Sequence, residues 1–172
     1  LDRYYQAAKT YRADVVVRFT ADCPLLDPEV IDLTLRAFLD HQVDFAANRL
    51  PPPFKRTYPI GLDTEVCTFA ALERAWKEAT EKYEREHVMP YIYQTEGRFK
   101  VLRVEYEKDY GHWRITVDTQ PDLDLINKVF EHFGRQAFNW LDVIHYLEEH
   151  PEVAQINANI THKTVFDVDH RS

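Results

Sequence analysis

The sequence predicts an α/β fold, because short hydrophobic strands alternate with amphipathic helices along the chain. The first predicted strand, residues 14–20, contains the continuous valine run 15–17, which is typical of a strand buried in a parallel sheet. An acidic, proline-containing turn at residues 22–24 follows directly. Open α/β sheets bind ligands beyond the carboxyl ends of their strands. We therefore expect a ligand site near Asp22.

Helices are predicted where apolar residues recur at intervals of three or four. The pair Asp27-Pro28 favours a helix start, since Asp is a good N-cap and proline suits the first helical position. The helix that follows carries apolar residues as far as Leu39. The other predicted helices span residues 1–11, 70–82, 84–95 (interrupted near Pro90), 121–133 and 140–149.

Further strands are predicted from alternating or continuous apolar residues bounded by turn signals. They are residues 43–48, 62–69, 99–106 and 113–117. Three consecutive prolines begin a predicted loop at residues 51–59. Periodicity is lost from Pro151 onwards, so residues 151–172 are predicted to form a C-terminal arm or a subunit contact.

Composition limits the classes of function. The 172 residues suit one globular domain or most of a larger one, and 45% hydrophobic residues can fill a core. The net charge of -8 disfavours nonspecific binding to nucleic acid or to an anionic membrane. Only two cysteines are present, Cys23 and Cys67, which favours a reducing cytoplasm. No apolar run reaches the roughly 20 residues of a membrane span.

Glycine is unusually scarce. The chain has four glycines, whereas average usage predicts about twelve. Neither a G-x-G-x-x-G nor a Walker pattern occurs, so a glycine-rich phosphate loop is missing from this chain. Because the chain also starts at Leu1, within a helical pattern, we interpret it as a portion of a longer protein.

Two strand-end aspartates are candidate metal ligands. Asp22 follows the first strand, and Asp118 follows the strand predicted at residues 113–117. Mg²⁺ prefers oxygen ligands and is often held by one or two carboxylates together with substrate phosphates. The alternative is that each aspartate caps the next helix. For Asp27 and Asp122, capping is the better explanation.

Two other segments carry candidate binding residues. Residues 56–65 join an arginine-bearing loop to a strand, and arginine suits a carboxylated substrate. The alternative there is a solvated entry to the strand. In residues 85–93, His87 follows Glu86 and precedes an aromatic-rich helix, where it is either a cleft donor or half of a structural pair.

Four segments in order carry a resemblance to a known family. They are residues 17–25, 58–66, 85–92 and 114–119. Together they resemble the cytidylyltransferase family that includes CMP-3-deoxy-manno-octulosonate and acylneuraminate synthetases. The similarity is closer to its branch of spore coat polysaccharide biosynthesis protein F. The resemblance implies a Rossmann-like three-layer α/β/α nucleotidyltransferase fold with a mostly parallel sheet.

The resemblance also implies an activity. It is the Mg²⁺-dependent transfer of CMP from CTP to a sugar or sugar acid, with release of pyrophosphate, in surface polysaccharide biosynthesis. Asp22 and Asp118 would hold the metal, with Arg114 as a further catalytic group. Glu86 and His87 would support substrate binding. The positions implied at the sugar side are Arg56, Tyr58, Gly61, Asp63 and Glu65.

One departure from the family is serious, because its nucleotide-binding strand and loop should precede Leu1. Residues 1–150 would then be the C-terminal portion of a single, N-terminally truncated nucleotidyltransferase domain, and the chain alone is expected to be poorly active or inactive. The aromatic-rich C-terminal part favours a homodimer. The alternatives are a non-catalytic binding or assembly module and a nucleotide-sugar-dependent glycosyltransferase, for which residues 167–169 would be a D-x-D motif.

Overall fold

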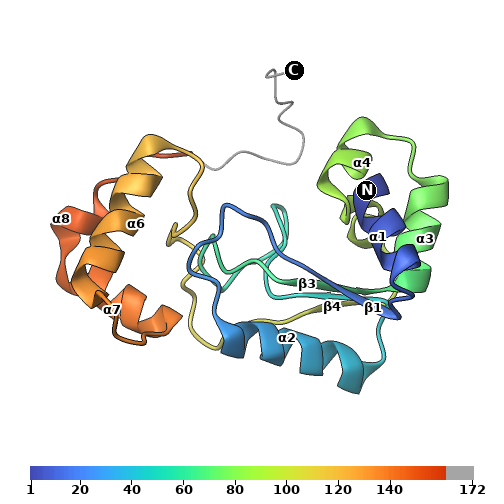
Figure 1. The fold of residues 1–172 in the computed structure, drawn as a ribbon, viewed down its shortest axis with the longest axis horizontal. Helices are drawn as coiled ribbons and strands as arrows, with labels where there is room; N and C mark the ends of the chain where they lie inside the picture. Colours follow the sequence, from blue (N-terminus) through green and yellow to red (C-terminus); the bar gives the residue numbers. More distant parts are fainter. Residues whose placement is uncertain (162–172) are drawn as a thin grey trace.

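A computed structural model of the chain describes residues 1–161 and has a four-stranded sheet at its centre (Figure 1). The strands are β1 (Val15–Arg18), β2 (Phe45–Ala47), β3 (Glu65–Thr68) and β4 (Val101–Arg103). Helix α2 (Pro28–His41) lies below the sheet in this view, while α1 (Asp2–Thr10) and α3 (Phe69–Glu78) lie above it. The predicted α/β class and three-layer arrangement are confirmed.

The sheet is mixed, with strand order β1-β3-β2-β4. Strands β1, β2 and β4 run in one direction, whereas β3 is antiparallel to both of its neighbours. The predicted common strand direction therefore holds for β1, β2 and β4. It does not hold for β3, which runs the opposite way. The reason is the connection between β2 and β3, which returns the chain beside β2 without a crossover helix, so the two strands must be antiparallel.

Successive side chains of the strands are buried on opposite faces of the sheet. Phe45 and Ala47 join the hydrophobic cluster beneath α1 and α3. Ala46 and Val66 instead pack with Phe38 of α2. Both faces of the sheet are thus covered, which explains why β2, with the sequence Phe-Ala-Ala, is apolar and buried throughout.

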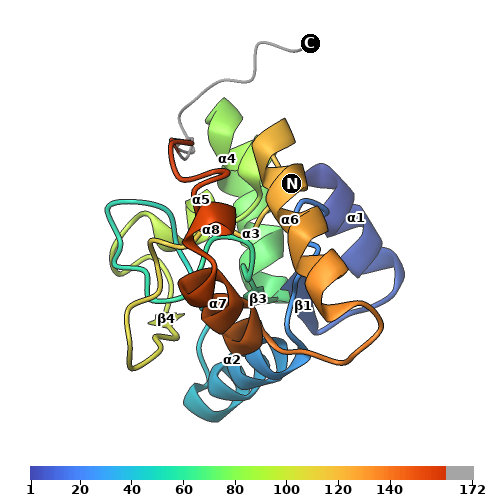
Figure 2. The same ribbon diagram turned by 90° about the vertical axis from the view of Figure 1, so that its left-hand side faces the viewer.

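A second lobe lies at the left of Figure 1 and faces the viewer in Figure 2. It consists of α6 (Gln120–Phe133), α7 (Trp140–Glu149) and α8 (Pro151–Ala154). Its own hydrophobic cluster combines Leu125 and Ile144 with Ile115 from the central part of the chain. Val153 of α8 is buried in the same cluster, so the first part of the segment 151–172, predicted as an arm, packs onto the lobe.

The helix predicted at residues 84–95, with an interruption near Pro90, is present as α4 (Lys82–His87) and α5 (Pro90–Tyr93), so the predicted interruption is confirmed. The break is a tight three-residue turn in which the Met89 amide donates to the His87 carbonyl at 2.9 Å, with a positive φ of 75° at Val88.

The strand predicted at residues 113–117 is an extended segment with a single parallel bridge between Arg114 and Ile60. The Ile115 amide donates to the Ile60 carbonyl at 2.8 Å. Two residues further on, the Val117 amide donates to the Asp22 carbonyl at 2.8 Å instead. The segment changes partners along its length, so it never forms a ladder.

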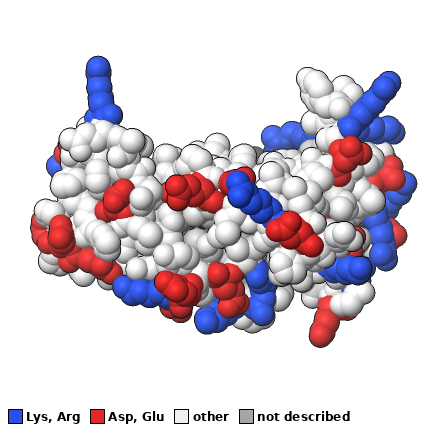
Figure 3. Space-filling model, turned by 90° about the horizontal axis from the view of Figure 1, so that it is seen from below, with Lys and Arg blue, Asp and Glu red and all other residues white. Residues whose placement is uncertain are grey.

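Acidic and basic side chains alternate over the α2 side of the molecule (Figure 3). Arg36 and Asp32 of α2 form an ion pair of 2.6 Å across one helical turn. Within residues 1–161, no helix is both long enough and apolar enough to cross a lipid bilayer.

Both predicted caps are present, and Asp27 also joins the two lobes. Its Oδ1 accepts hydrogen bonds from the amides of Glu29 and Val30 at 2.8 and 3.3 Å. Its Oδ2 accepts from the amide of Trp140, at the start of α7, at 3.0 Å. One buried carboxylate therefore caps α2 and satisfies a donor of the second lobe.

Replacement of this carboxylate provides a test. Asp27→Ala should lower the free energy of unfolding by about 2 kcal/mol, because it removes a helix cap and leaves the buried Trp140 amide unpaired. Urea unfolding measures the change. Asp40→Ala, on the exposed side of the same helix, is the matched control and should change stability by less than about 0.5 kcal/mol. Equal losses in both variants would contradict the assignment.

Candidate functional site

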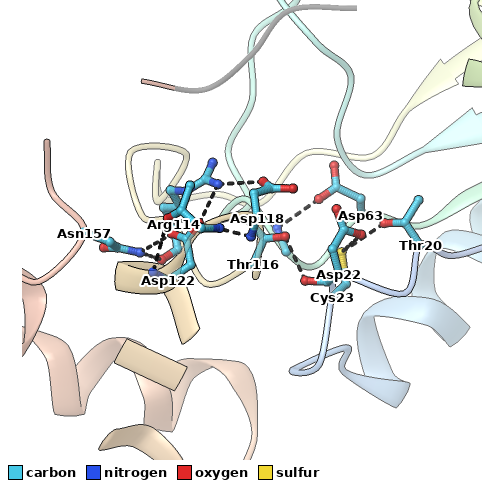
Figure 4. Close-up of polar contacts among 11 residues, drawn as sticks. Thr20, Asp22, Cys23, Asp63, Arg114, Thr116, Asp118, Asp122 and Asn157 are labelled. Atoms are coloured by element: carbon cyan, nitrogen blue, oxygen red, sulfur yellow. Dashed lines mark hydrogen bonds and ion pairs between the residues drawn. The ribbon is translucent and has the colours of Figure 1, made fainter. Parts of the chain in front are cut away.

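The candidate site lies beyond the carboxyl end of β1, where two distant segments meet (Figure 4). The Asp22 carbonyl accepts hydrogen bonds from the Val117 amide and from the Thr116 hydroxyl, both at 2.8 Å. These bonds hold the turn that carries Asp22 against the segment that ends in Asp118. The two predicted metal carboxylates therefore belong to adjacent pieces of backbone.

Asp118 is oriented by an ion pair. Its Oδ2 accepts from Nη2 of Arg114 at 2.6 Å, and its side chain remains 46% exposed. The carboxylate is thus held in place on one side and accessible to solvent on the other. Asp22 is half-buried at the neighbouring turn.

Arg114 itself is largely buried, with 8% of its side chain exposed. Its Nε donates to Oδ1 of Asp122 at 2.8 Å, and its Nη2 donates to Oδ2 at 2.9 Å. This is the two-pronged geometry in which arginine binds a carboxylate most specifically. Because the guanidinium is buried, Arg114 is placed to position Asp118 rather than to face a ligand.

Asp122 is fully buried and collects an unusual number of donors. Besides Arg114, it accepts from the amides of Asp118 and Thr119 at 3.1 and 3.0 Å and from the Asn157 side chain at 2.9 Å. Burial alone would raise the pKa of this carboxyl. The hydrogen bonds from Arg114, Asn157 and the backbone outweigh burial and hold the pKa well below its usual range.

Sequence reasoning assigned Asp122 only as a cap and missed Asn157. The capping role is confirmed, because Thr119 and Asp122 form a capping box at the start of α6. The only sequence signal for the pairing of Asp122 with Arg114 is their separation of eight residues. That separation does not by itself indicate an ion pair. Asn157 lies in a stretch without periodicity, so nothing local indicates that it reaches this site.

Gly61 is required by a close approach of backbone. Its φ is 109°, and a Cβ at this position would lie 2.6 Å from the carbonyl oxygen of Ile115. Its amide donates to Oδ2 of Asp63 at 2.9 Å. Gly61 therefore lets the loop cross close to the segment 113–117. This close approach accounts for a glycine here, and its place at the sugar side stays a prediction.

The charged residues predicted at the sugar side mostly have partners within the chain. Asp63 pairs with Arg49, and Glu65 pairs with Arg18 across the β1–β3 ladder. Asp63 keeps 25% of its side chain exposed, beside the Asp22 turn in Figure 4. The Glu65 side chain is only 12% exposed, so its main role in this structure is the buried ion pair.

Arg56 and Tyr58 have different environments. Arg56 is half-buried, and burial together with the nearby Arg49 charge lowers the pKa of its guanidinium. Its Nη1 is buried without a hydrogen-bond partner among the described residues. Tyr58 is 1% exposed, and its ring packs on Tyr106 and Trp140, so it is a core residue here and its role in substrate binding stays a prediction. Burial raises the pKa of its hydroxyl to about 12.

Glu86 and His87 are not brought to the aspartates. They lie on α4, at the opposite end of the molecule from α6 (Figure 1). Glu86 is exposed, and the His87 carbonyl accepts from Met89 in the tight turn. Their predicted role as substrate-binding groups at the same site has no support from the positions of these side chains.

The residues at the strand end fit a magnesium ion that is completed by a ligand. Among residues 1–161, no group of three or more His, Cys, Asp or Glu side chains is arranged to hold a metal by itself. Asp22 and Asp118 supply two carboxylates, and Mg²⁺ commonly takes no more than that from a protein when phosphates are bound. Burial raises the pKa of neighbouring Cys23 to about 12, so its thiol stays protonated at neutral pH.

The three-layer fold, with acidic groups beyond the carboxyl end of the edge strand β1, defines a Rossmann-like α/β protein. A family model described as cytidylyltransferase matches residues 1–138. The chain therefore belongs to the cytidylyltransferase family. Residues 167–169, the D-x-D sequence, lie outside the residues described here.

Similar proteins come from several organisms. A cytidylyltransferase structure from Leptospira borgpetersenii has a TM-score of 0.84 and 35% identity over 94% of this chain and 66% of its own. The uncharacterized protein MJ1063 of Methanocaldococcus jannaschii is 39% identical over 98% of this chain and 68% of its own. The spore coat polysaccharide biosynthesis protein SpsF of Bacillus subtilis is 26% identical over 90% and 63%. The chain thus spans about two thirds of the length of each protein.

The buried carboxylate predicts a pH dependence. Because the pKa of Asp122 is lower in the folded protein than in the unfolded chain, where it is about 3.9, its stabilisation is complete above about pH 5. It is lost progressively as the pH falls toward the lowered value. Asp122→Asn should cost about 3 kcal/mol at pH 7, because it leaves Arg114 buried with a weakened partner.

The difference between wild type and Asp122→Asn should shrink as the pH falls from 5 to 2.5, as measured by urea unfolding at each pH. Asp124→Asn, at an exposed position of α6, is the matched control and should follow the wild type at every pH. A difference that stays constant with pH would show that the charge of Asp122 does not contribute.

Proposed function

We propose that this chain belongs to a Mg²⁺-dependent enzyme that transfers CMP from CTP to a hydroxyl group of a sugar or sugar acid and releases pyrophosphate. The proposed setting is surface polysaccharide biosynthesis, which the name of the SpsF relative supports. The observation that carries the proposal is the hydrogen-bonded junction of the Asp22 turn with the segment that ends in Asp118. It supports the proposal because it joins the two segments that carry these carboxylates, beyond the strand end where this class of fold binds its ligands.

Asp22 and Asp118 are the residues that would hold the metal ion. A magnesium ion bound there would neutralise charge on the phosphates of the nucleotide. The protein's own contribution is to orient these carboxylates before the ligand arrives. Arg114 does this for Asp118, and the backbone bonds from Thr116 and Val117 do it for Asp22.

On the sugar side, Arg56 and Asp63 are the groups that best suit a polar acceptor. The buried Nη1 of Arg56 has a hydrogen-bonding capacity that no described residue fills, and a sugar hydroxyl or carboxylate would fill it. The partly exposed carboxylate of Asp63 can accept from a hydroxyl group. Tyr58 and Glu65 would support these groups from within the structure.

The main rival is a binding or assembly module that has the same fold without the chemistry. Isothermal titration with Mg²⁺ and CTP separates the two. In the proposed enzyme, Asp22→Asn and Asp118→Asn should each weaken Mg²⁺-dependent CTP binding at least about tenfold, because each removes a charged oxygen ligand. Asp124→Asn is the control and should bind as the wild type does. Binding of CTP that is indifferent to Mg²⁺ and to both substitutions would contradict the metal role.

Turnover by the isolated chain is a separate prediction. Because the glycine-rich phosphate loop expected of a nucleotide site is not found in these residues, a coupled assay of pyrophosphate release should detect little or no CTP turnover. Brisk turnover would show that residues 1–172 hold a complete nucleotide site. Three further expectations from the sequence also remain proposals. They are a homodimer, a cytoplasmic location and a single domain over residues 1–150.

A further inference from the structure

We propose that Asn157 is a positioning residue of the candidate site, which acts through Asp122 and Arg114 on Asp118. Asn157 lies after α8, outside the residues 1–138 that the cytidylyltransferase family model matches. The effect on metal binding rests on the function proposed above. The arrangement of the four side chains stands independently of it.

Asn157 bridges two parts of the site with one amide group. Its side chain is buried, with 5% of the residue exposed. Nδ2 donates to Oδ1 of Asp122 at 2.9 Å and to the carbonyl oxygen of Arg114 at 3.1 Å. It therefore holds both the main chain of Arg114 and the carboxylate that fixes the Arg114 guanidinium (Figure 4).

Asp118 is affected through Arg114, because the two aspartates share one of the Arg114 nitrogens. Its Nη2 donates to Oδ2 of Asp122 at 2.9 Å and to Oδ2 of Asp118 at 2.6 Å, so one nitrogen serves two carboxylates. The Asn157 amide supplies Asp122 with an additional polar donor. Without it, the Asp122 carboxylate loses a donor that fixes its orientation, so Asp122 holds the guanidinium less firmly. The hold of Arg114 on Asp118 then weakens as well.

Asp118 depends on its bond to Arg114 because packing does not fix its side chain. The side chain is 46% exposed, and it pairs with the Arg114 guanidinium. The backbone of Asp118 is tied to the same array, since its amide donates to Oδ2 of Asp122 at 3.1 Å. Loss of Asn157 would thus loosen the carboxylate and the turn that carries it, while the aspartate itself remains.

The first experiment needs no ligand. In ¹H–¹⁵N spectra, hydrogen exchange of the Arg114 Nε–H reports how firmly its guanidinium is held. We expect exchange to be at least about tenfold faster in Asn157→Ala than in the wild type. Asn159→Ala, an exposed asparagine two residues away, is the matched control and should leave the rate unchanged. Asn157→Ser is the milder variant, to be used if Asn157→Ala does not fold. An unchanged Arg114 signal in a folded Asn157 variant would overturn the proposal.

The second experiment measures the effect on the metal site. Mn²⁺ replaces Mg²⁺ as the probe, and its binding in the presence of CTP is followed by electron paramagnetic resonance. Variants at Asn157 should bind Mn²⁺ about tenfold more weakly, as is typical when a group that orients a metal ligand is removed, while Asn159→Ala matches the wild type. Wild-type affinity in a folded Asn157 variant would overturn the link to Asp118. If the wild type itself binds no Mn²⁺, the proposed function fails, and the exchange experiment still decides the positioning role.

Discussion

The buried ion pair between Arg114 and Asp122 is the interaction on which the rest of the site depends. Two opposite charges are removed from water there. Their burial is tolerated because both carboxylate oxygens of Asp122 accept hydrogen bonds. The pair links the extended segment 113–117 to the start of α6. Asp118 lies between these two elements, so its position is set by the same contacts.

The site is formed where the two lobes of the molecule meet. Asp27, at the start of α2, accepts from the Trp140 amide of α7, and the Asp22 carbonyl accepts from the segment before α6. Through these contacts, the second lobe packs against the loop that follows the carboxyl end of β1. A protein that assembles its acidic groups at such a junction couples their geometry to the packing of α6, α7 and α8.

Local sequence signals predicted the secondary structure well where the cause is itself local. The caps at Asp27 and Asp122 and the apolar spacing of α6 and α7 depend on neighbouring residues only, and the structure confirms them. The direction of β3 and the single bridge at Arg114 depend on which distant strand each segment meets. Alternation of apolar residues indicates an extended backbone but does not identify its partner.

The sequence by itself determined the family through four ordered motifs, and it predicted Asp22 at the end of strand β1. Only the tertiary structure decided that Tyr58 is a core residue, that α4 lies away from the aspartates, and that Asn157 reaches Asp122. The physical reason is that a side chain's burial and its long-range hydrogen bonds are properties of the packed chain. Residue type and spacing do not contain them.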